Sequence, residues 1–282
     1  MNAVVTLKAD HSLTDLLAAA GLARSTFFYH QARMGAPDPK AQLKAAITDV
    51  FTVNKARYGY RRVHRVLIQD GWQVNRKTVL KLMRELRLAS TSRRRRRYVS
   101  YRGKVGQIAE NILDRDFDAQ AMNEKWVTDV TEFRVGDEKL YLSPVMDLCN
   151  REIIAYSTSR SPNLQLTNSS LCDAIATLEP GQHPLVHSDQ GFQYQHRSWR
   201  ALLADAGATQ SMSRKANCFD NAVMENFFGH LKEECFHHVR YLSIDALETA
   251  LHEYIRWYNN DRIIERLEGL SPVQYRTQTL AA

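Results

Sequence analysis

The sequence has few cysteines, and their spacing forms no zinc or redox motif. Its four cysteines are Cys149, Cys172, Cys218 and Cys235, and none lies within four residues of another. This excludes a zinc knuckle and a CxxC pair, and the ten histidines complete no metal cage with the cysteines. We therefore expect free thiols in a reducing compartment.

Long apolar runs are also missing. No stretch reaches the ~18 apolar residues that a membrane-spanning helix needs. Residues 1–10 lack the basic start, apolar centre and small-residue cleavage site of a signal peptide. The prediction is a soluble, cytoplasmic protein with no membrane partner.

Charge is abundant but unevenly distributed along the 282 residues, a length that suits about two domains. Residues 1–104 hold 22 Lys and Arg against 6 Asp and Glu, whereas residues 105–282 hold 16 against 25. This asymmetry indicates a nucleic-acid-binding part joined to an acidic part. An acidic part that works on DNA needs bound divalent cations to offset phosphate repulsion.

The first 90 residues are predicted to be helical and to contain two helix-turn-helix units. Residues 1–36 form the first, for which DNA or partner binding and plain helix packing both stay open. Residues 40–90 form the second, whose outer faces are basic and suit DNA; a merely solvated charged surface is the alternative. The candidate DNA contacts are Arg61, Arg62, Arg76 and Lys77.

A run of five arginines follows the helical region. It consists of Arg93, Arg94, Arg95, Arg96 and Arg97. Like charges packed this tightly do not form a core, so residues 91–117 are predicted to be an extended basic linker. Such a linker suits contact with DNA phosphates, with an affinity that falls as salt rises.

From residue 125 onward the pattern is that of a mixed α/β domain, predicted to span residues 118–278. Strands are expected at residues 126–133, 140–148, 152–157, 183–187 and 209–212. Helices are expected at residues 163–178, 196–206, 221–236 and 244–259. Three strands followed by alternating helices and strands is a mixed α/β layout.

Three acidic residues are placed where one sheet edge would gather them. Asp129 lies in the first strand, Asp189 directly follows the fourth, and Glu225 lies in a helix, with 35 residues between Asp189 and Glu225. Gly191 is expected to let the chain turn after Asp189, and Asp220 and Asn221 are expected to cap the helix of Glu225. Spacing alone does not exclude three rival acids: Asp147, Asp173 and Glu233.

Phosphodiester chemistry explains why three carboxylates would be needed. Two Mg²⁺ ions ~3.5–4 Å apart hold the attacking and leaving oxygens of an in-line displacement, and hard cations prefer oxygen ligands. No serine or tyrosine motif demands a covalent nucleophile. Lys232, seven residues after Glu225, would hold a phosphate near the metals; a solvated helix lysine is the alternative.

Several motifs resemble the integrase core of bacterial insertion-sequence transposases of the IS3 family, in its second-frame product, OrfB. These are residues 126–133 (WVTDVTEF), 187–191 (HSDQG) and 220–228 (DNAVMENFF). The 35-residue spacing from aspartate to glutamate and the later basic residue match too. Residues 58–63 (YGYRRV) resemble the family's helix-turn-helix, and residues 258–260 and 269–275 its C-terminal tail. The resemblance covers about residues 40–276.

The resemblance implies an RNase H-like fold with a mixed five-stranded sheet. It also implies that Asp129, Asp189 and Glu225 are catalytic and hold two Mg²⁺ or Mn²⁺ ions. The expected activity is DNA cleavage and strand transfer at the terminal inverted repeats of an insertion sequence. The expected partners are double-stranded DNA, a second copy of the chain, and an OrfA frame joined by frameshifting. The expected location is the nucleoid of the bacterial cytosol.

Two other functions fit part of the pattern. A catalytically inactive DNA-binding regulator of transposition would need only the basic half, and an RNase H-like nuclease acting on RNA would use the same acids. The residues 262–268 are more acidic than the family's usual basic stretch, so no DNA-gripping role is expected of them.

Overall fold

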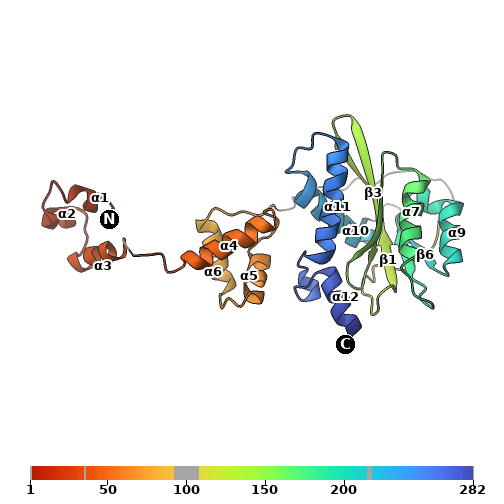
Figure 1. Ribbon diagram of the computed structural model, residues 1–282, viewed down its shortest axis with the longest axis horizontal. Coiled ribbons are helices and arrows are strands. Elements are labelled where there is room, and N and C mark those ends of the chain that lie inside the picture. Colours follow the sequence, from red (N-terminus) through yellow and green to blue (C-terminus); the bar gives the residue numbers. More distant parts are fainter. Residues whose placement is uncertain (1, 35, 92–107, 215–217, 282) are drawn as a thin grey trace. The chain divides into compact units, whose positions relative to one another are not determined.

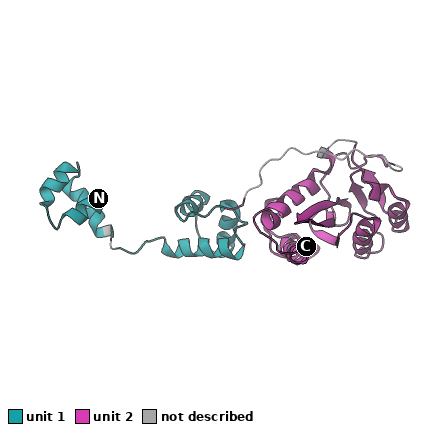
Figure 2. Cartoon of the chain, turned by 90° about the horizontal axis from the view of Figure 1, so that it is seen from above, with its two compact units in different colours: residues 1–89 teal, residues 90–282 magenta. Residues whose placement is uncertain are grey.

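The computed structural model describes residues 2–34, 36–91, 108–214 and 218–281, and the chain divides into two compact units (Figure 1). Residues 1–89 form unit 1 and residues 90–282 form unit 2, coloured teal and magenta in Figure 2. The five arginines of residues 93–97 lie outside the described residues. No helix in the described parts of the chain has the length and apolar character needed to cross a membrane.

Unit 1 is entirely helical in its described residues. Its helices are α1 (Asn2–Leu7), α2 (Leu13–Ala19), α3 (Arg24–Met34), α4 (Ala41–Val53), α5 (Tyr60–Gln69) and α6 (Arg76–Glu85). Val4, Leu17 and Phe27 bury themselves together and join the first three helices into a small core. Helix α1 is the one element of this unit that the sequence pattern did not predict.

The helices α4, α5 and α6 build a second core, because each presents a stripe of apolar residues at helical spacing. The fully or nearly fully buried residues are Ile47, Tyr58, Val63, Leu67, Val79, Leu82 and Met83. The turn between α5 and α6 passes through Gly71 at φ +86°, a conformation that favours glycine. Asn75 then caps α6, accepting a hydrogen bond from the Lys77 N–H at 2.8 Å.

Unit 2 is a mixed α/β domain. Its strands are β1 (Lys125–Thr128), β2 (Thr131–Val135), β3 (Glu138–Asp147), β4 (Ile153–Ser159), β5 (Leu185–Ser188) and β6 (Thr209–Met212). Its α-helices are α7 (Leu164–Ile175), α8 (Phe192–Gln195), α9 (Arg197–Asp205), α10 (Ala222–Leu231), α11 (Ile244–Asn260) and α12 (Pro272–Ala281). Three short helical turns complete it: η1 (Cys218–Asn221), the π-helical η2 (Lys232–Phe236) and η3 (Glu265–Leu267).

The sheet contains six strands where five were expected, because the first expected strand is interrupted. Both β1 and β2 pair antiparallel with β3, and β2 continues the register that β1 begins. Between them, the Asp129 carboxylate accepts the N–H of its own neighbour Val130 at 2.7 Å. The interruption thus falls at the residue that the sequence singled out. The remaining pairs are β3 with β4, antiparallel, and β1 with β5 and β5 with β6, both parallel.

Both faces of the sheet are buried under helices (Figure 1). Alternate residues of a strand point to opposite faces, so Val127 packs with α10 and α11 while its neighbour Trp126 packs with α7 and α9. Met146 and Val145 on β3 divide in the same way. Two apolar cores therefore hold the strands rigidly and fix the positions of the residues that follow them.

Candidate active site

Asp129 and Asp189 leave two adjacent parallel strands at the same level. In the pairing of β1 with β5, Trp126 lies opposite Val186 and Val127 opposite His187, a constant offset of 60 residues. The same offset relates Asp129 to Asp189, each the first residue after its strand. Neighbouring strands lie ~4.8 Å apart, so the pairing brings the two half-buried carboxylates to one edge of the sheet.

The Asp189 carboxylate folds back over the backbone that follows it. Its Oδ1 accepts the Gly191 N–H at 2.8 Å. Gly191 has an ordinary φ of −58°, so the expected reason for a glycine here, a turn only glycine can make, is wrong. The reason is space: a Cβ on residue 191 would lie 2.9 Å from that same Oδ1.

Glu225 lies in the first turn of α10 and is half-buried. Two apolar contacts hold this helix against the sheet: Met224 and Phe228 pack in the same core as Val127 of β1. Asn221 occupies the N-cap position, but its side chain makes no capping hydrogen bond, so its predicted capping role is wrong. Its side chain donates instead to the carbonyl oxygen of Thr128.

The pKa of Asp129 is shifted by burial and by the charges of its neighbours. Burial raises this pKa well above its ordinary value, and the negative charge of Asp189 raises it further. The hydrogen bond from Val130 acts against this, and Glu225 again raises the pKa while Lys232 lowers it. Burial likewise raises the pKa of Asp189, against the hydrogen bond from Gly191. The structure thus places Asp129 within the electrostatic influence of Asp189, Glu225 and Lys232.

Lys232 begins the π-helical turn that continues α10, and it is half-buried rather than a solvated helix lysine. Its Nζ lies 5.4 Å from the centre of the Phe133 ring, a cation–π contact. Burial lowers its pKa, while the charges of Glu132 and Asp129 raise it. Lys232 therefore faces acidic neighbours at the sheet edge.

The three rival acids have other surroundings. Asp147 is fully buried, and its two oxygens accept the N–H groups of Asn123 and Cys149, each at 2.8 Å. Asp173 is exposed on α7. Glu233 accepts a hydrogen bond from His238 at 2.7 Å. Asp147 thus holds a turn, and none of the three rivals appears among the charges that act on Asp129.

The donor atoms of Asp129, Asp189 and Glu225 are those that a hard divalent cation prefers, because all are carboxylate oxygens. Within the part of the chain that the structure describes, no group of three or more His, Cys, Asp and Glu side chains stands ready to hold a metal ion. Burial raises the pKa of both aspartates, and the charges of Asp189 and Glu225 raise that of Asp129 further, so Asp129 is repelled by the two other acids. Side-chain movement would be needed for them to share an ion, and the ion's charge would favour that movement.

Comparison with known proteins identifies the family. Two family models, each described as an integrase core domain, match residues 119–218 and 225–280, and a third, described as an HTH-like domain, matches residues 38–97. The chain is 49% identical over 273 residues to the protein named as transposase InsK for insertion sequence element IS150 of Escherichia coli K12, covering 97% of this chain and 96% of that one. The chain belongs to the IS150/IS3-type transposases.

A second relative agrees with this membership. Transposase InsF for insertion sequence IS3A of Escherichia coli K12 is 35% identical over 238 residues, which are 84% of this chain and 83% of InsF. Among solved structures, the catalytic core domain of HTLV-2 integrase in complex with magnesium is 17% identical, with a TM-score of 0.44, covering 54% of this chain and 95% of that one. The family membership confirms the expected transposase and integrase-core resemblance.

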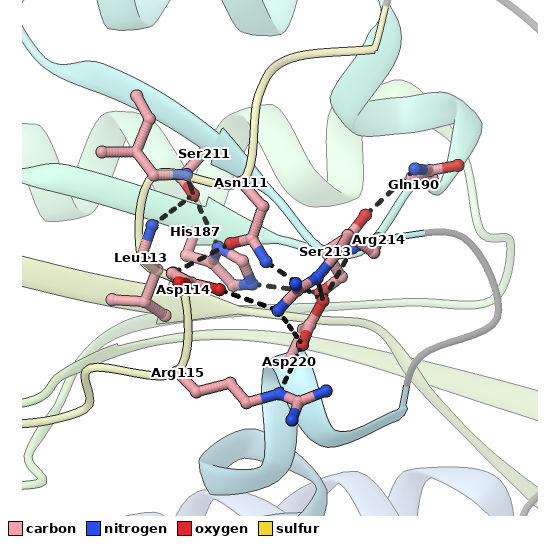
Figure 3. A network of polar contacts seen from close by, with 11 residues as sticks. Asn111, Leu113, Asp114, Arg115, His187, Gln190, Ser211, Ser213, Arg214 and Asp220 are labelled. Atoms are coloured by element: carbon pink, nitrogen blue, oxygen red, sulfur yellow. Dashed lines mark hydrogen bonds and ion pairs between the residues drawn. The ribbon is translucent and has the colours of Figure 1, made fainter.

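A second cluster of charged residues in the transposase, drawn in Figure 3, was not expected from the sequence. At its centre is Asp220, whose side chain is fully buried. Its Oδ2 accepts the Arg214 N–H at 2.9 Å and Nε at 3.0 Å, together with the Asn111 amide at 3.0 Å, and its Oδ1 accepts Arg115 Nε at 2.8 Å. Asp220 therefore joins the start of α10 to two other segments, whereas a capping role had been predicted.

The same network reaches the strand that precedes Asp189. The buried His187 contacts the hydroxyl of Ser211 at 2.8 Å and that of Ser213 at 3.0 Å. Burial lowers the pKa of His187 to about 4, so the ring is neutral near pH 7. Ser211 also accepts the N–H groups of Ile112 and Leu113. Residues 111–115, within the stretch predicted to be a linker, are thus bound to β6 and α10.

The transposase should lose the stabilising contribution of Asp220 in acid. Burial alone would raise this pKa, but hydrogen bonds from Arg214 and Arg115 outweigh it and lower the pKa to about 2. The contribution, about 2 kcal/mol, is therefore complete above the unfolded-state pKa near 4 and is lost as pH falls toward 2. Denaturant unfolding of wild type and Asp220→Asn should differ at pH 6 and converge near pH 2. A difference independent of pH would contradict this assignment.

The candidate DNA contacts of unit 1 differ in exposure. Arg61 is exposed, with its guanidinium 5.7 Å from the centre of the Tyr60 ring, whereas Arg62 is half-buried, 5.6 Å from that of Tyr58. Arg76 and Lys77 are exposed in the first turn of α6. Arg62 thus packs against a buried ring, and the other three present their charge to solvent.

Proposed function

We propose that this transposase cleaves DNA and transfers strands at the terminal inverted repeats of an insertion sequence, using Asp129, Asp189 and Glu225 to hold two Mg²⁺ or Mn²⁺ ions. The observation that carries the proposal is the pairing of β1 with β5, from which Asp129 and Asp189 leave adjacent strands at the same level. The charges of Glu225 and Lys232 also act on the pKa of Asp129, Glu225 raising it and Lys232 lowering it, which supports a site formed by these four residues. The regulator and RNA nuclease alternatives gain no support from any observation.

The chain's own residues prepare this site for positive charge. Among the described residues, the carboxylates of Asp129 and Asp189 each accept one backbone N–H group, from Val130 and Gly191, which leaves most of their oxygen lone pairs available for other contacts. A bound cation reverses the effect of the acidic neighbours and lowers the pKa of Asp129. When bound, two such ions would activate water or a DNA 3′-hydroxyl and stabilise the leaving oxygen.

Lys232 would bind a DNA phosphate beside the acids. The burial of its stem and its contact with Phe133 restrict the positions that its ammonium reaches. Glu132, the first acid that acts on it, is held by Lys139 at 3.0 Å and Tyr141 at 2.8 Å. Glu132 therefore already has other partners for its charge. An incoming phosphate could pair with Lys232 without breaking a close ion pair between Lys232 and Glu132.

Unit 1 and the arginine run would hold the DNA duplex. Arg61, Arg76 and Lys77 contribute exposed positive charge from α5 and α6, and the family match to an HTH-like domain covers both helices. Arg62 and the arginines at positions 93–97 would add phosphate contacts. Neutralised phosphates release counterions, so affinity should fall steeply as salt rises. Synapsis of two DNA ends calls for a second copy of the chain, and OrfA, fused by frameshifting, would complete the enzyme on the nucleoid of the bacterial cytosol.

Metal removal tests the proposed function. The purified chain, alone and fused to OrfA, is incubated with labelled DNA carrying the element's ends in Mg²⁺, in Mn²⁺ or in EDTA. We expect strand-transfer product with either metal and none in EDTA, because three repelling carboxylates need a counter-charge before they act. Product in EDTA would contradict the proposal, as would cleavage of an RNA–DNA hybrid in preference to the DNA ends.

A further inference from the structure

One buried amide joins the helix that carries Glu225 to the strand that ends at Asp129. Asn221 is 4% exposed, and its Nδ2 donates a hydrogen bond to the carbonyl oxygen of Thr128 at 3.1 Å. The two residues are 93 positions apart in the sequence. The contact therefore connects two elements that are distant in the sequence, the start of α10 and the end of β1.

Both ends of this hydrogen bond lie beside a carboxylate of the proposed metal site. Thr128 directly precedes Asp129, and Asn221 precedes Glu225 by four residues, about one helical turn. A shift of the Asn221 amide relative to the Thr128 carbonyl would therefore change the separation of the two carboxylates. Lengthening this contact by a fraction of an ångström is enough to matter where a metal ion sets the geometry.

The neighbouring residue fixes the backbone from which Asn221 projects. Asp220 is bound by Arg214, Arg115 and Asn111, and these contacts join β6 and the segment before β1 to the start of α10 (Figure 3). The main chain at Asn221 is thus held on one side by this ion cluster. The Asn221 amide adds a directional contact between the start of α10 and the end of β1, in addition to the apolar contacts of Met224 and Phe228.

Stability alone does not explain an asparagine at this position. Its Oδ1 is buried and has no hydrogen-bond partner among the described residues, and a buried acceptor without a partner destabilises the folded state. The amide also gives no capping hydrogen bond to α10. What it does provide is the contact with Thr128, directly beside Asp129.

We propose that Asn221 is a positioning residue, which sets the separation of the Asp129 and Glu225 carboxylates so that both reach the same divalent ion. This inference rests on the proposed function. Residues that support metal ligands change metal affinity by about 10- to 100-fold when they are replaced. Mg²⁺ demands a nearly ideal octahedron, so a loosened site should lose Mg²⁺-supported activity more than Mn²⁺-supported activity.

The test compares two asparagines that each connect a helix to a strand. Asn221→Ala removes the contact with Thr128. The matched control, Asn259→Ala, removes the contacts of α11 with Ile153 of β4, at 3.0 and 2.9 Å, away from the acids. Mn²⁺ binding to the full chain is measured by electron paramagnetic resonance, and thermal unfolding is measured alongside. A second variant, Asn221→Ser, is too short to keep the contact and serves if the alanine variant does not fold.

We expect Asn221→Ala and Asn221→Ser to bind Mn²⁺ at least ~10-fold more weakly than wild type, and Asn259→Ala to lower the melting temperature while binding Mn²⁺ normally. Wild-type affinity in a folded Asn221 variant would overturn the proposal, as would equal weakening by Asn259→Ala. The variant Asp129→Asn distinguishes failure of the proposed metal site from failure of the proposed positioning role. If it binds Mn²⁺ like wild type, the proposed metal site itself fails; if it loses binding while the Asn221 variants do not, only the positioning role fails.

Discussion

Replacing Glu225 by glutamine should reduce the rate of strand transfer by more than ~100-fold. Replacing a residue that only supports a metal ligand already lowers metal affinity or activity by about 10- to 100-fold, and Glu225 is proposed to be a ligand itself. The substitution keeps the size of the side chain and removes its charge. It should also lower the pKa of Asp129, because Glu225 is one of the charges that raise it. DNA binding should be unchanged or slightly tighter, because a negative charge near the DNA is lost.

The matched control is Glu233→Gln, eight residues further along the same helical segment. Glu233 is bound to His238 and is not among the charges that act on Asp129. Rates are measured on labelled DNA ends at saturating Mg²⁺, and binding is measured by titration of the same DNA. Full activity in Glu225→Gln would remove Glu225 from the catalytic set, and equal loss in both variants would show a general effect of charge.

Replacing Arg262 by alanine should lower the free energy of unfolding by about 3–5 kcal/mol, because it removes the buried positive charge that is paired with the Glu234 carboxylate. Arg262 and Glu234 are each 4% exposed and form a two-pronged pair, Nε to Oε2 at 3.0 Å and Nη2 to Oε1 at 2.8 Å. Tyr254 donates to the same Glu234 oxygen at 2.9 Å. The pair joins the chain after α11 to the turn that carries Lys232.

Two further variants show whether the loss of stability comes from breaking the buried pair of Arg262 and Glu234 or from removing an arginine side chain as such. The double variant Glu234→Leu with Arg262→Met should recover much of the lost stability, because no buried charge is then left alone. Arg160→Ala removes a half-exposed arginine that contacts Asp245 and Glu248, and it should cost less than ~1 kcal/mol. Denaturant unfolding of the full chain measures all three. A small effect of Arg262→Ala would contradict the assigned role of the pair.

The buried pair of Arg262 and Glu234 also gives a structural role to the first residue of the segment 262–268. Residues 262–268 were expected to have no DNA-gripping role because they are more acidic than the family's usual basic stretch. The structure adds a reason at the first of them, since Arg262 is buried against Glu234 and Tyr258. A buried arginine is not accessible to DNA.

The sequence predicted the sheet well because strand periodicity and the positions of the acids are local properties. The expected strand at residues 209–212 has the observed bounds of β6, and those of β3 and β4 differ by one or two residues at each end. The break at Asp129 was not predicted. It depends on a carboxylate that hydrogen-bonds to the next N–H, which leaves no mark on hydrophobic periodicity.

The site was predictable as far as residue types and spacing reach. Asp129 and Asp189 could be placed together because one was expected in the first strand and the other directly after the fourth, at one edge of the sheet. Asn221 and Asp220 were assigned to capping because both are good N-cap residues. Their actual partners, Thr128 and Arg115, lie about 100 residues away in the sequence, and no local pattern reports such contacts.

Gly191 is another residue whose role could not be predicted from the local sequence. A glycine after a carboxylate suggests a turn, and the sequence offers no means of telling backbone freedom from lack of space. The structure decides for space, because the Asp189 carboxylate occupies the position that a Cβ would need.

The most direct test of the central claim is where Mn²⁺ binds. Crystals of the full chain soaked in Mn²⁺ are measured at a wavelength that reveals manganese by anomalous scattering. We expect peaks within coordination distance of carboxylate oxygens of Asp129, Asp189 and Glu225, with two ions ~3.5–4 Å apart once DNA is bound. Manganese bound elsewhere, with these three carboxylates empty of metal, would contradict this claim.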